Sequence, residues 1–288
     1  MALLLTIIIN GCIVGSIYAI IAMGLSTQYG VARILNLAHG EFIILAAFIT
    51  YILHTRTGVH PLVAVIIAGP IAFGISFALH ITLYRRARKI SHGAGGFESN
   101  AILIAFGVYF IMQNFIQSNM GGTSTAYLFM PYPVQVGPAN ISAGGLLVLL
   151  IAVIICIAYS MFLARTRMGK AIRAAAQDPQ AAAMLGIKID SVMALCFAIG
   201  GFLAACAGVL ISMRDTFSAS GGMGYTTIAI IVVVLGGLGS VRGAIFGGFI
   251  LGIVGVAVSS FDTGLMDSVF YLIVLVLLIV RPKGLLGS

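Results

Sequence analysis

The chain has 288 residues, of which 61% are hydrophobic and only 8% are charged. A soluble globular protein carries about 25% charged residues, so a chain of this length with so few charges cannot cover a water-facing surface. The composition therefore predicts a membrane protein and excludes nearly all soluble enzymes. The net charge of +8 does not indicate a nucleic-acid partner, because the basic residues stand in short clusters between apolar runs, as in the loops of membrane proteins.

The apolar runs predict a series of membrane helices. The first run covers residues 3–24, and no basic residue precedes it, so we expect a retained membrane helix rather than a cleaved signal peptide. The later runs are 42–53, 61–84, 100–117, 143–163, 191–212, 224–238, 244–260 and 267–280. A spanning helix needs about 20 residues, so the runs 42–53 and 224–238 are either completed by flanking residues or are half-helices in a protein-lined cavity.

These runs predict an all-α, polytopic membrane protein with eight or nine crossings, some of them short or broken. No change in composition divides the chain, so we expect residues 1–288 to form a single transmembrane domain.

The positions of lysine and arginine predict the orientation of the helices. Eleven basic residues follow runs that we expect to end in the cytoplasm: Arg85, Arg86, Arg88, Lys89, Arg165, Arg167, Lys170, Arg173, Lys188, Arg281 and Lys283. If nine crossings alternate, Arg33 and Arg242 lie on the same side, and only Arg56 and Arg214 remain outside. We therefore expect the N-terminus outside and the C-terminus in the cytoplasm.

Two segments between the apolar runs differ in character. Residues 119–141 carry no charge and are rich in Gly, Pro and aromatic residues, so we expect an outside loop without a spanning helix. Residues 165–190 are basic and rich in Ala, and Asp178-Pro179 interrupts them, which predicts two short helices on the cytoplasmic surface. They form either a solvated connector or a docking surface, and their length favours docking.

Polar residues near the membrane gather in two Gly-containing turns, residues 28–42 and 235–249. Their similarity is weak, but it is compatible with two related halves whose turns face the same side. Ionisable groups at membrane depth are costly, so Asn36, His39 and Glu41 are candidate functional residues. Alternatively, Glu41 lies at an interfacial helix start, where a carboxylate favours the positive end of the helix dipole.

The absence of several motifs limits the chemistry of the chain. It contains no G-x-x-x-x-G-K-[ST] sequence, so energy from ATP would have to come through another subunit. It contains no G-x-S-x-G nucleophile elbow, and the H-x-E sequence at residues 39–41 has no P-C-x-x-C after it. We therefore expect no enzymatic activity, no cofactor and no metal site.

Five segments together resemble a known family. The chain is similar, over almost its whole length, to the permease subunits of bacterial branched-chain amino-acid ABC importers, within the wider group that includes ribose-type permeases. The segments that carry the resemblance are GSIYAIIAMGL at 15–25, YGVARILNLAHGEF at 29–42, RTRMGKAIRAAAQDPQAAAMLGI at 165–187, GGLGSVRGAIFGGFILG at 236–252 and VRPKGLLG at 280–287.

The resemblance implies a segment that couples the permease to an ATPase. Its residues would be Gly169, Arg173, Ala174, Ala175, Ala176, Asp178 and Gly186. The chain has Ala-Ala-Ala where the widely found coupling pattern begins Glu-Ala-Ala. The resemblance also implies two ATP-binding subunits, a related second permease, a periplasmic or lipid-anchored solute-binding protein, and a place among the lipids of the bacterial cytoplasmic (inner) membrane.

The resemblance further implies a translocation path for branched-chain or other hydrophobic amino acids, with urea, short amides or another small organic solute as the alternative. The residues expected along this path are Asn36, His39, Glu41, Gly236, Gly237, Gly239, Ser240 and Gly243. Two other classes stay open on the residues alone. One is an ion-coupled secondary transporter with Glu41 as its proton or cation site, and the other is a passive channel.

Overall fold

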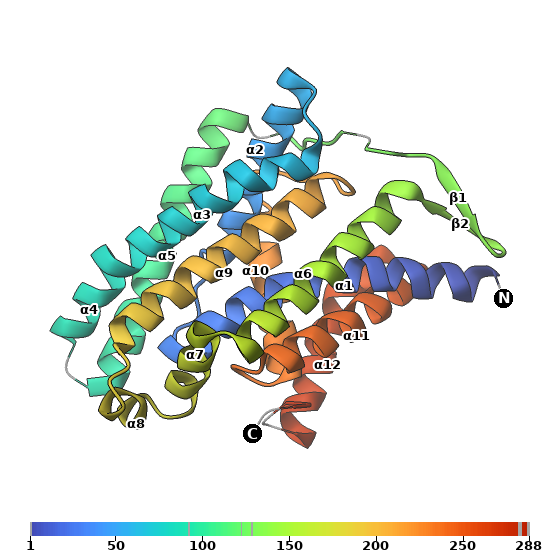
Figure 1. The fold of residues 1–288 in the computed structure, drawn as a ribbon. Helices are drawn as coiled ribbons and strands as arrows, with labels where there is room; N and C mark the ends of the chain where they lie inside the picture. Colours follow the sequence, from blue (N-terminus) through green and yellow to red (C-terminus); the bar gives the residue numbers. More distant parts are fainter. Residues whose placement is uncertain (1, 92, 122, 128, 282–283, 287–288) are drawn as a thin grey trace.

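The computed structural model describes residues 2–91, 93–121, 123–127, 129–281 and 284–286. Parts of two segments discussed above lie outside the described residues, namely Gly122, Leu128, Pro282, Lys283 and Gly287. The described chain is almost entirely helical (Figure 1), which confirms the all-α prediction.

The long elements are α1 (Ala2–Ala32), α2 (His39–Thr57), α3 (Val65–Leu79), α5 (Gly93–Met120), α6 (Ala143–Arg165), α9 (Ile189–Ser212), α10 (Gly222–Gly236), α11 (Val241–Ser259) and α12 (Met266–Val280). The short elements are η1 (Pro61–Ala64), the single π-helical turn η2 (His80–Tyr84), α4 (Arg85–Ile90), β1 (Pro133–Val136), β2 (Ala139–Ser142), α7 (Arg167–Gln177), α8 (Pro179–Met184) and η3 (Thr263–Leu265).

Seven helical segments within the described residues are long and apolar enough to cross a membrane. They include α1, α6, α9 and α11, the continuous stretch from η1 to α4, most of α5, and η3 with α12. The helix α10 has 15 residues; at about 1.5 Å per residue it is only about 22 Å long, too short for a hydrocarbon core of about 30 Å. The prediction of a polytopic protein with short elements is therefore confirmed.

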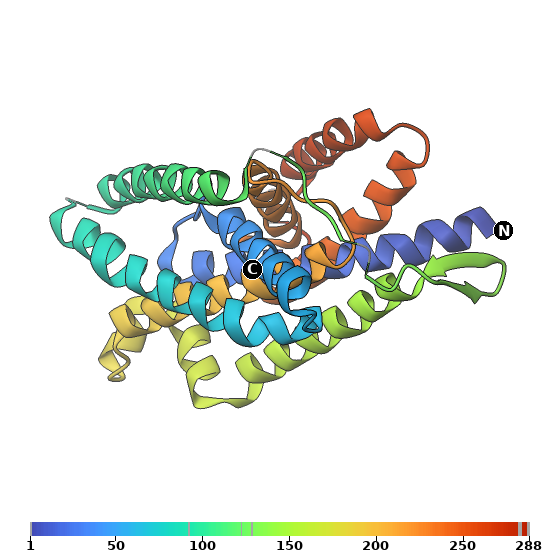
Figure 2. The same cartoon turned by 90° about the horizontal axis from the view of Figure 1, so that it is seen from above.

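The helices α1 and α11 pack closely because glycines line their contact. They are antiparallel: Gly11 lies against Ile253, and Gly15 lies against Phe249. On α11, Gly248 faces the backbone of Ala19. Small residues let backbones approach in lipid, where packing replaces the hydrophobic effect as the main force between helices. Figures 1 and 2 show α1 running between α11 and α6.

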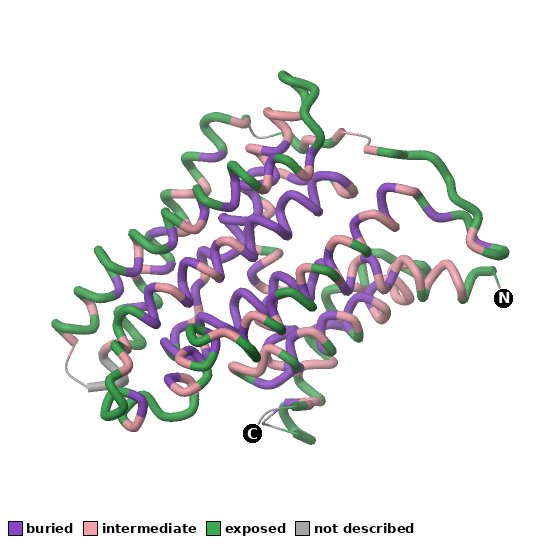
Figure 3. Tube along the Cα trace, viewed as in Figure 1, coloured by how far each residue is buried: buried purple, intermediate pink, exposed green. Residues whose placement is uncertain are grey.

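The helix α9 forms the other half of the core. It packs on α1, α2 and α3, and most of its length is buried, whereas Phe270 is the one buried residue of α12. Figure 3 shows the buried residues gathered along α9 and the inner part of α1. The helices α3, α5 and α6 are only partly buried, as expected for helices that pack on the bundle with one face and meet lipid with the other.

One end of the bundle, which we call the hairpin end, carries the 119–141 loop. No spanning helix forms within its described residues, as predicted, but the sequence did not predict the antiparallel hairpin of β1 and β2. The hairpin turns at Gly137, which has φ +59°, and a Cβ on Gly137 would lie 3.7 Å from the side chain of Leu5. Backbone hydrogen bonds join Thr125 to Phe217, and the Tyr127 hydroxyl lies 3.0 Å from that of Ser212. The loop therefore packs on the start of α1 and the end of α9.

The opposite end, which we call the α7 end, carries α7 and α8. These two short helices follow directly on one another, as predicted from Asp178-Pro179. Ala176 lies near Gly30 at the end of α1, so α7 contacts the bundle itself. Arg85 and Arg88 form exposed ion pairs with Asp190, at 3.7 and 3.5 Å, which joins α4 to the start of α9.

The glycine contact between α1 and α11 generates a stability prediction. The substitution Gly252→Ala should lower the thermal unfolding midpoint of the purified protein, because a Cβ on Gly252 would overlap the backbone of Gly15. Overpacking of this kind costs about 1–3 kcal/mol. Unfolding can be followed with a thiol-reactive dye, since Cys156, Cys196 and Cys206 are free and buried.

Gly107→Ala is the matched control, because a Cβ at Gly107 meets no atom within 4 Å. Its unfolding midpoint should equal or exceed that of the unmodified chain, since alanine favours a helix over glycine. Equal midpoints for the two variants would contradict the close packing of α1 on α11.

Candidate functional site

The helix α2 begins inside the bundle instead of at its surface. After α1 ends at Ala32, residues 33–38 return into the bundle without helical structure. The Nε2 atom of His39 then lies 3.1 Å from the carbonyl oxygen of Ile21. Ile21 precedes the end of α1 by 11 residues, which places the start of α2 about 16 Å from that end.

The helix α10 reaches the same point from the hairpin end, after the connector 213–221 that follows α9. The amide of Gly40 donates to Thr226 Oγ1 at 2.8 Å, and Thr226 Oγ1 donates to the Leu37 carbonyl at 3.1 Å. A Cβ on Gly40 would overlap the carbonyl oxygen of Gly222, so only glycine permits this approach. The N-termini of α2 and α10 therefore meet inside the bundle.

The carboxylate of Glu41 lies at this junction of α2 with α10. Its side chain packs on Gly222, where a Cβ would overlap Oε1. Glu41 is 0% exposed, and neither carboxylate oxygen has a hydrogen-bond partner among the described residues. The positive ends of two helix dipoles converge here and favour an anion. Glu41 does lie in the first turn of α2, as the alternative for this residue supposed, but it is buried inside the protein instead of lying at its surface.

The other two polar candidates of this turn are buried beside the junction. His39 is enclosed by α1, with its ring against Gly24. Asn36 is almost as buried, and its Oδ1 atom accepts a hydrogen bond from the amide of Ala38 at 3.2 Å. Asn36, His39 and Glu41 are therefore all buried in the same part of the bundle, as expected from their closeness in the sequence.

The second candidate group, the turn between α10 and α11, lies at the α7 end. Ser240 Oγ accepts from the amide of Gly243 at 3.1 Å and caps α11. Gly237 and Gly239 have φ values of +103° and +83°, which residues other than glycine rarely adopt. Gly236 and Gly243 touch backbone to backbone.

The two candidate groups are therefore separate. Glu41 contacts the first residue of α10, Gly222, whereas Gly236 is its last residue. With 15 residues in the helix, these ends are about 21 Å apart. The structure does not bring the buried polar centre together with the 236–243 turn, and only a path running the length of α10 would touch both.

The coupling candidates on α7 divide into buried and exposed residues. Gly169 is buried against the backbone of Leu163, where any side chain would overlap α6. Ala175 is also buried, Ala174 and Ala176 are half-buried, and Arg173 is exposed. The alanines therefore press α7 onto the bundle, which explains why small residues occupy this stretch.

The remaining coupling candidates form the exposed tip of the segment. Asp178 Oδ1 accepts from the amides of Gln180 and Ala181, at 2.8 and 3.0 Å, and so caps α8. Gly186 has φ +84° just after the helix. Between them, Met184 and Leu185 are 83% and 82% exposed. The sequence analysis did not single out these two; an apolar pair directly before a helix-ending glycine is the signal that could have found them.

Comparison with known proteins agrees with this geometry. The family model described as branched-chain amino acid transport system / permease component matches residues 7–280. The chain is 32% identical to the high-affinity branched-chain amino acid transport system permease protein LivH of Escherichia coli K12, over 96% of this chain and 94% of LivH. It is 29% identical to the corresponding protein BraD of Pseudomonas aeruginosa, over 97% and 94% of the two chains.

A more distant relative shares only part of the chain. The autoinducer 2 import system permease protein LsrC of Photorhabdus laumondii is 34% identical over 39% of this chain and 34% of its own length. No solved structure matches the chain. The helices, the α7–α8 segment and the match over residues 7–280 lead to one conclusion: the chain is a multi-pass membrane protein of the branched-chain amino acid transport permease family.

Proposed function

We propose that the chain is the permease subunit of an ABC importer in the bacterial cytoplasmic (inner) membrane and forms the path for branched-chain or other hydrophobic amino acids. The supporting observation is an exposed apolar tip, Met184 and Leu185, at one end of a helical bundle whose relatives LivH and BraD are branched-chain amino acid permeases. Its partners are two ATP-binding subunits, a related second permease and a solute-binding protein.

The α7–α8 segment transmits movement of the ATPase to the path. Met184 and Leu185 seat in the ATPase, because exposed apolar side chains gain most from burial in a partner. The helix α7 is fixed to α6 through Gly169 and to the end of α1 through Ala176. A force applied at the tip therefore reaches the end of α1, and residues 33–38 carry it to the start of α2.

The junction of α2 and α10 is the closed part of the path. Gly40 and Gly222 touch there, Glu41 packs on Gly222, and Asn36 and His39 are buried nearby in the same turn. Separation of the two helix N-termini opens the centre, and the backbone amides freed by it offer polar groups to the solute. The turn 236–243 then provides the exit at the cytoplasmic face, while the solute-binding protein docks at the hairpin end.

Uptake by proteoliposomes tests this function. The complete transporter, with its ATPases, second permease and loaded binding protein, should take up leucine only when ATP can be hydrolysed, and dissipating the proton and sodium gradients should leave the rate unchanged. A secondary transporter with Glu41 as its cation site requires the opposite result. Flux through the permease alone would indicate a channel, and uptake of urea or a short amide instead of leucine would establish the alternative substrate.

The exposed tip generates a coupling prediction. Leu185→Glu should reduce ATPase co-purification and leucine uptake by about tenfold or more, the effect of losing about 1.4 kcal/mol of binding energy. Ile90→Glu is the matched control, because Ile90 is a comparably exposed apolar residue at the α7 end, outside the segment. If Leu185→Glu keeps its ATPase and its uptake, the docking role of the tip is wrong.

The charge distribution generates a topology prediction that cysteine labelling can check. In a Cys12→Ser background, a membrane-impermeant maleimide should label Phe261→Cys in intact cells and Met184→Cys only after lysis. Both positions are more than four-fifths exposed, at 89% and 83%, and lie at opposite ends of the bundle. Labelling of Met184→Cys in intact cells would reverse the proposed orientation.

A further inference from the structure

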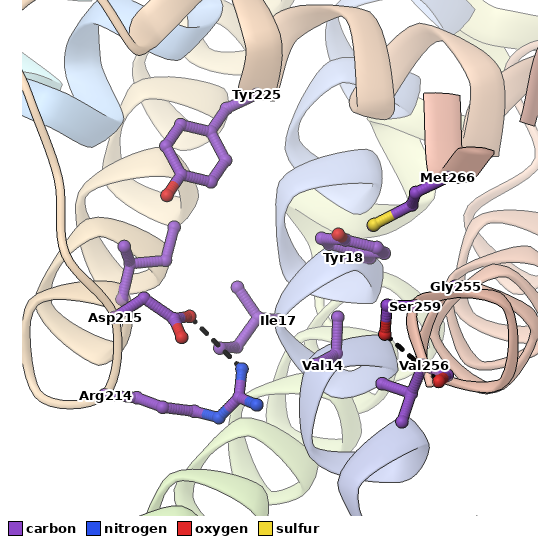
Figure 4. A pocket seen from close by; sticks show the side chains of 11 residues that line it. Val14, Ile17, Tyr18, Arg214, Asp215, Tyr225, Gly255, Val256, Ser259 and Met266 are labelled. Atoms are coloured by element: carbon purple, nitrogen blue, oxygen red, sulfur yellow. Dashed lines mark hydrogen bonds and ion pairs between the residues drawn. The ribbon is translucent and has the colours of Figure 1, made fainter. Parts of the chain in front are cut away.

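A cavity of about 250 Å³ opens near the hairpin end, between α1, the end of α9, α10, α11 and the start of α12. Figure 4 shows the side chains that surround it. Binding pockets for drug-sized ligands measure roughly 300–1,000 Å³, so this cavity matches a smaller solute, in the size range of one amino acid. It is distinct from the junction of α2 with α10.

One wall of the cavity carries both a positive and a negative charge. Arg214 and Asp215 follow α9 directly, and Arg214 Nη1 lies 3.2 Å from Asp215 Oδ2. Their side chains are 23% and 42% exposed, so each keeps polar atoms free for a ligand. Burial raises the pKa of the Asp215 carboxyl above its ordinary value, and the Arg214 guanidinium opposes that rise. A cation bound beside Asp215 would stabilise the carboxylate further.

The rest of the wall is mostly aliphatic, and Tyr18, Tyr225 and Ser259 add hydroxyl groups to it. Val14 and Ile17 come from α1, Val256 from α11, and Met266 from the start of α12. Tyr225 lies on the same side as Asp215 in Figure 4. The cavity therefore presents two opposite charges on one side and aliphatic side chains on the other.

This arrangement is complementary to a free aliphatic amino acid. A guanidinium has five N–H donors that suit a carboxylate, and a carboxylate accepts from an ammonium group. The two ionic groups of an α-amino acid are close together, like the adjacent charges of Arg214 and Asp215, and its side chain needs the apolar wall. Urea carries no charge and has no aliphatic part, so it would gain little here.

We propose that this cavity binds the zwitterion of an aliphatic amino acid on its way from the solute-binding protein to the path. Arg214 holds the carboxylate, Asp215 holds the ammonium group, and Val14, Ile17 and Met266 contact the side chain. The inference rests on the proposed function and adds a specificity site to it. Because Tyr225 is three residues from Gly222, the bound solute lies directly beside the closed junction.

The test uses the complete transporter without its binding protein, held in nanodiscs, and saturation-transfer NMR with three probes. Leucine carries both charges, 4-methylpentanoate only the carboxylate, and isopentylamine only the ammonium group. Leucine should bind most tightly. Arg214→Gln should weaken leucine and 4-methylpentanoate by about tenfold or more, the effect of losing a charge-assisted hydrogen bond, and should not weaken isopentylamine. Asp215→Asn should weaken leucine and isopentylamine and should not weaken 4-methylpentanoate.

This crossed pattern separates a ligand site from a structural ion pair, which would affect all three probes alike. Arg56→Gln and Asp262→Asn are the controls, because both are exposed charges that do not line the cavity; they should bind leucine as the unmodified chain does. Equal effects on the three probes, or unchanged leucine binding in both cavity variants, would overturn the proposal.

Uptake by the same variants keeps the two proposals apart. With the binding protein present, Arg214→Gln and Asp215→Asn should take up leucine about tenfold more slowly than the controls, in keeping with the lost contacts. If the unmodified transporter imports leucine with ATP and both variants do so equally well, the cavity site alone is wrong. If the unmodified transporter imports no hydrophobic amino acid at all, the proposed function is wrong.

Discussion

The contact between the N-termini of α2 and α10 determines how the rest of the bundle is arranged. Two helices that begin inside a membrane protein leave their first amides without helical partners, and their dipoles repel each other end to end. The carboxyl group of Glu41 packs between them, and Thr226 hydrogen-bonds across the contact. The long helices α1 and α9 enclose this junction because it must be kept from lipid. Because α2 and α10 both begin at this junction, the connectors 33–38 and 213–221 must run into the bundle to reach it.

Close helix packing gives this centre a rigid frame. Glycines bring α1 within backbone contact of α11, and Gly208 does the same between α9 and the carbonyl of Ile43 on α2. A closely packed interior is hard to compress, so a displacement of one helix also moves the helices packed against it. The α7–α8 segment lies at one end of this frame and the hairpin with its loop at the other.

Much of this fold follows from the pattern of apolar residues, but its centre does not. Hydrophobic runs and Asp178-Pro179 locate the helices and the two-part segment, because length and helix-breaking residues act locally. The depth of Glu41 could not be predicted, since the same carboxylate suits a helix start at the membrane surface. The grouping of Arg214 and Asp215 with Met266 could not be predicted either, because it depends on the end of α9 lying near the start of α12, and these are far apart in the sequence. The exposure of Met184 and Leu185 could not be predicted, because apolar residues of a membrane protein are usually buried or in contact with lipid.

The end of α10 opposite Glu41 shows how a helix of 15 residues can exist at membrane depth. Leu235 and Gly236 are buried in the protein, and a buried carbonyl group without a hydrogen-bond partner costs several kcal/mol. The amides of Leu285 and Leu286 donate to the carbonyls of Leu235 and Gly236, at 2.9 and 3.1 Å. Leu285 and Leu286 thus cap the C-terminal end of a helix that lies some fifty positions earlier in the sequence. A chain cut short after α12 would keep the membrane helices of the described residues and still leave these carbonyl groups of α10 without donors.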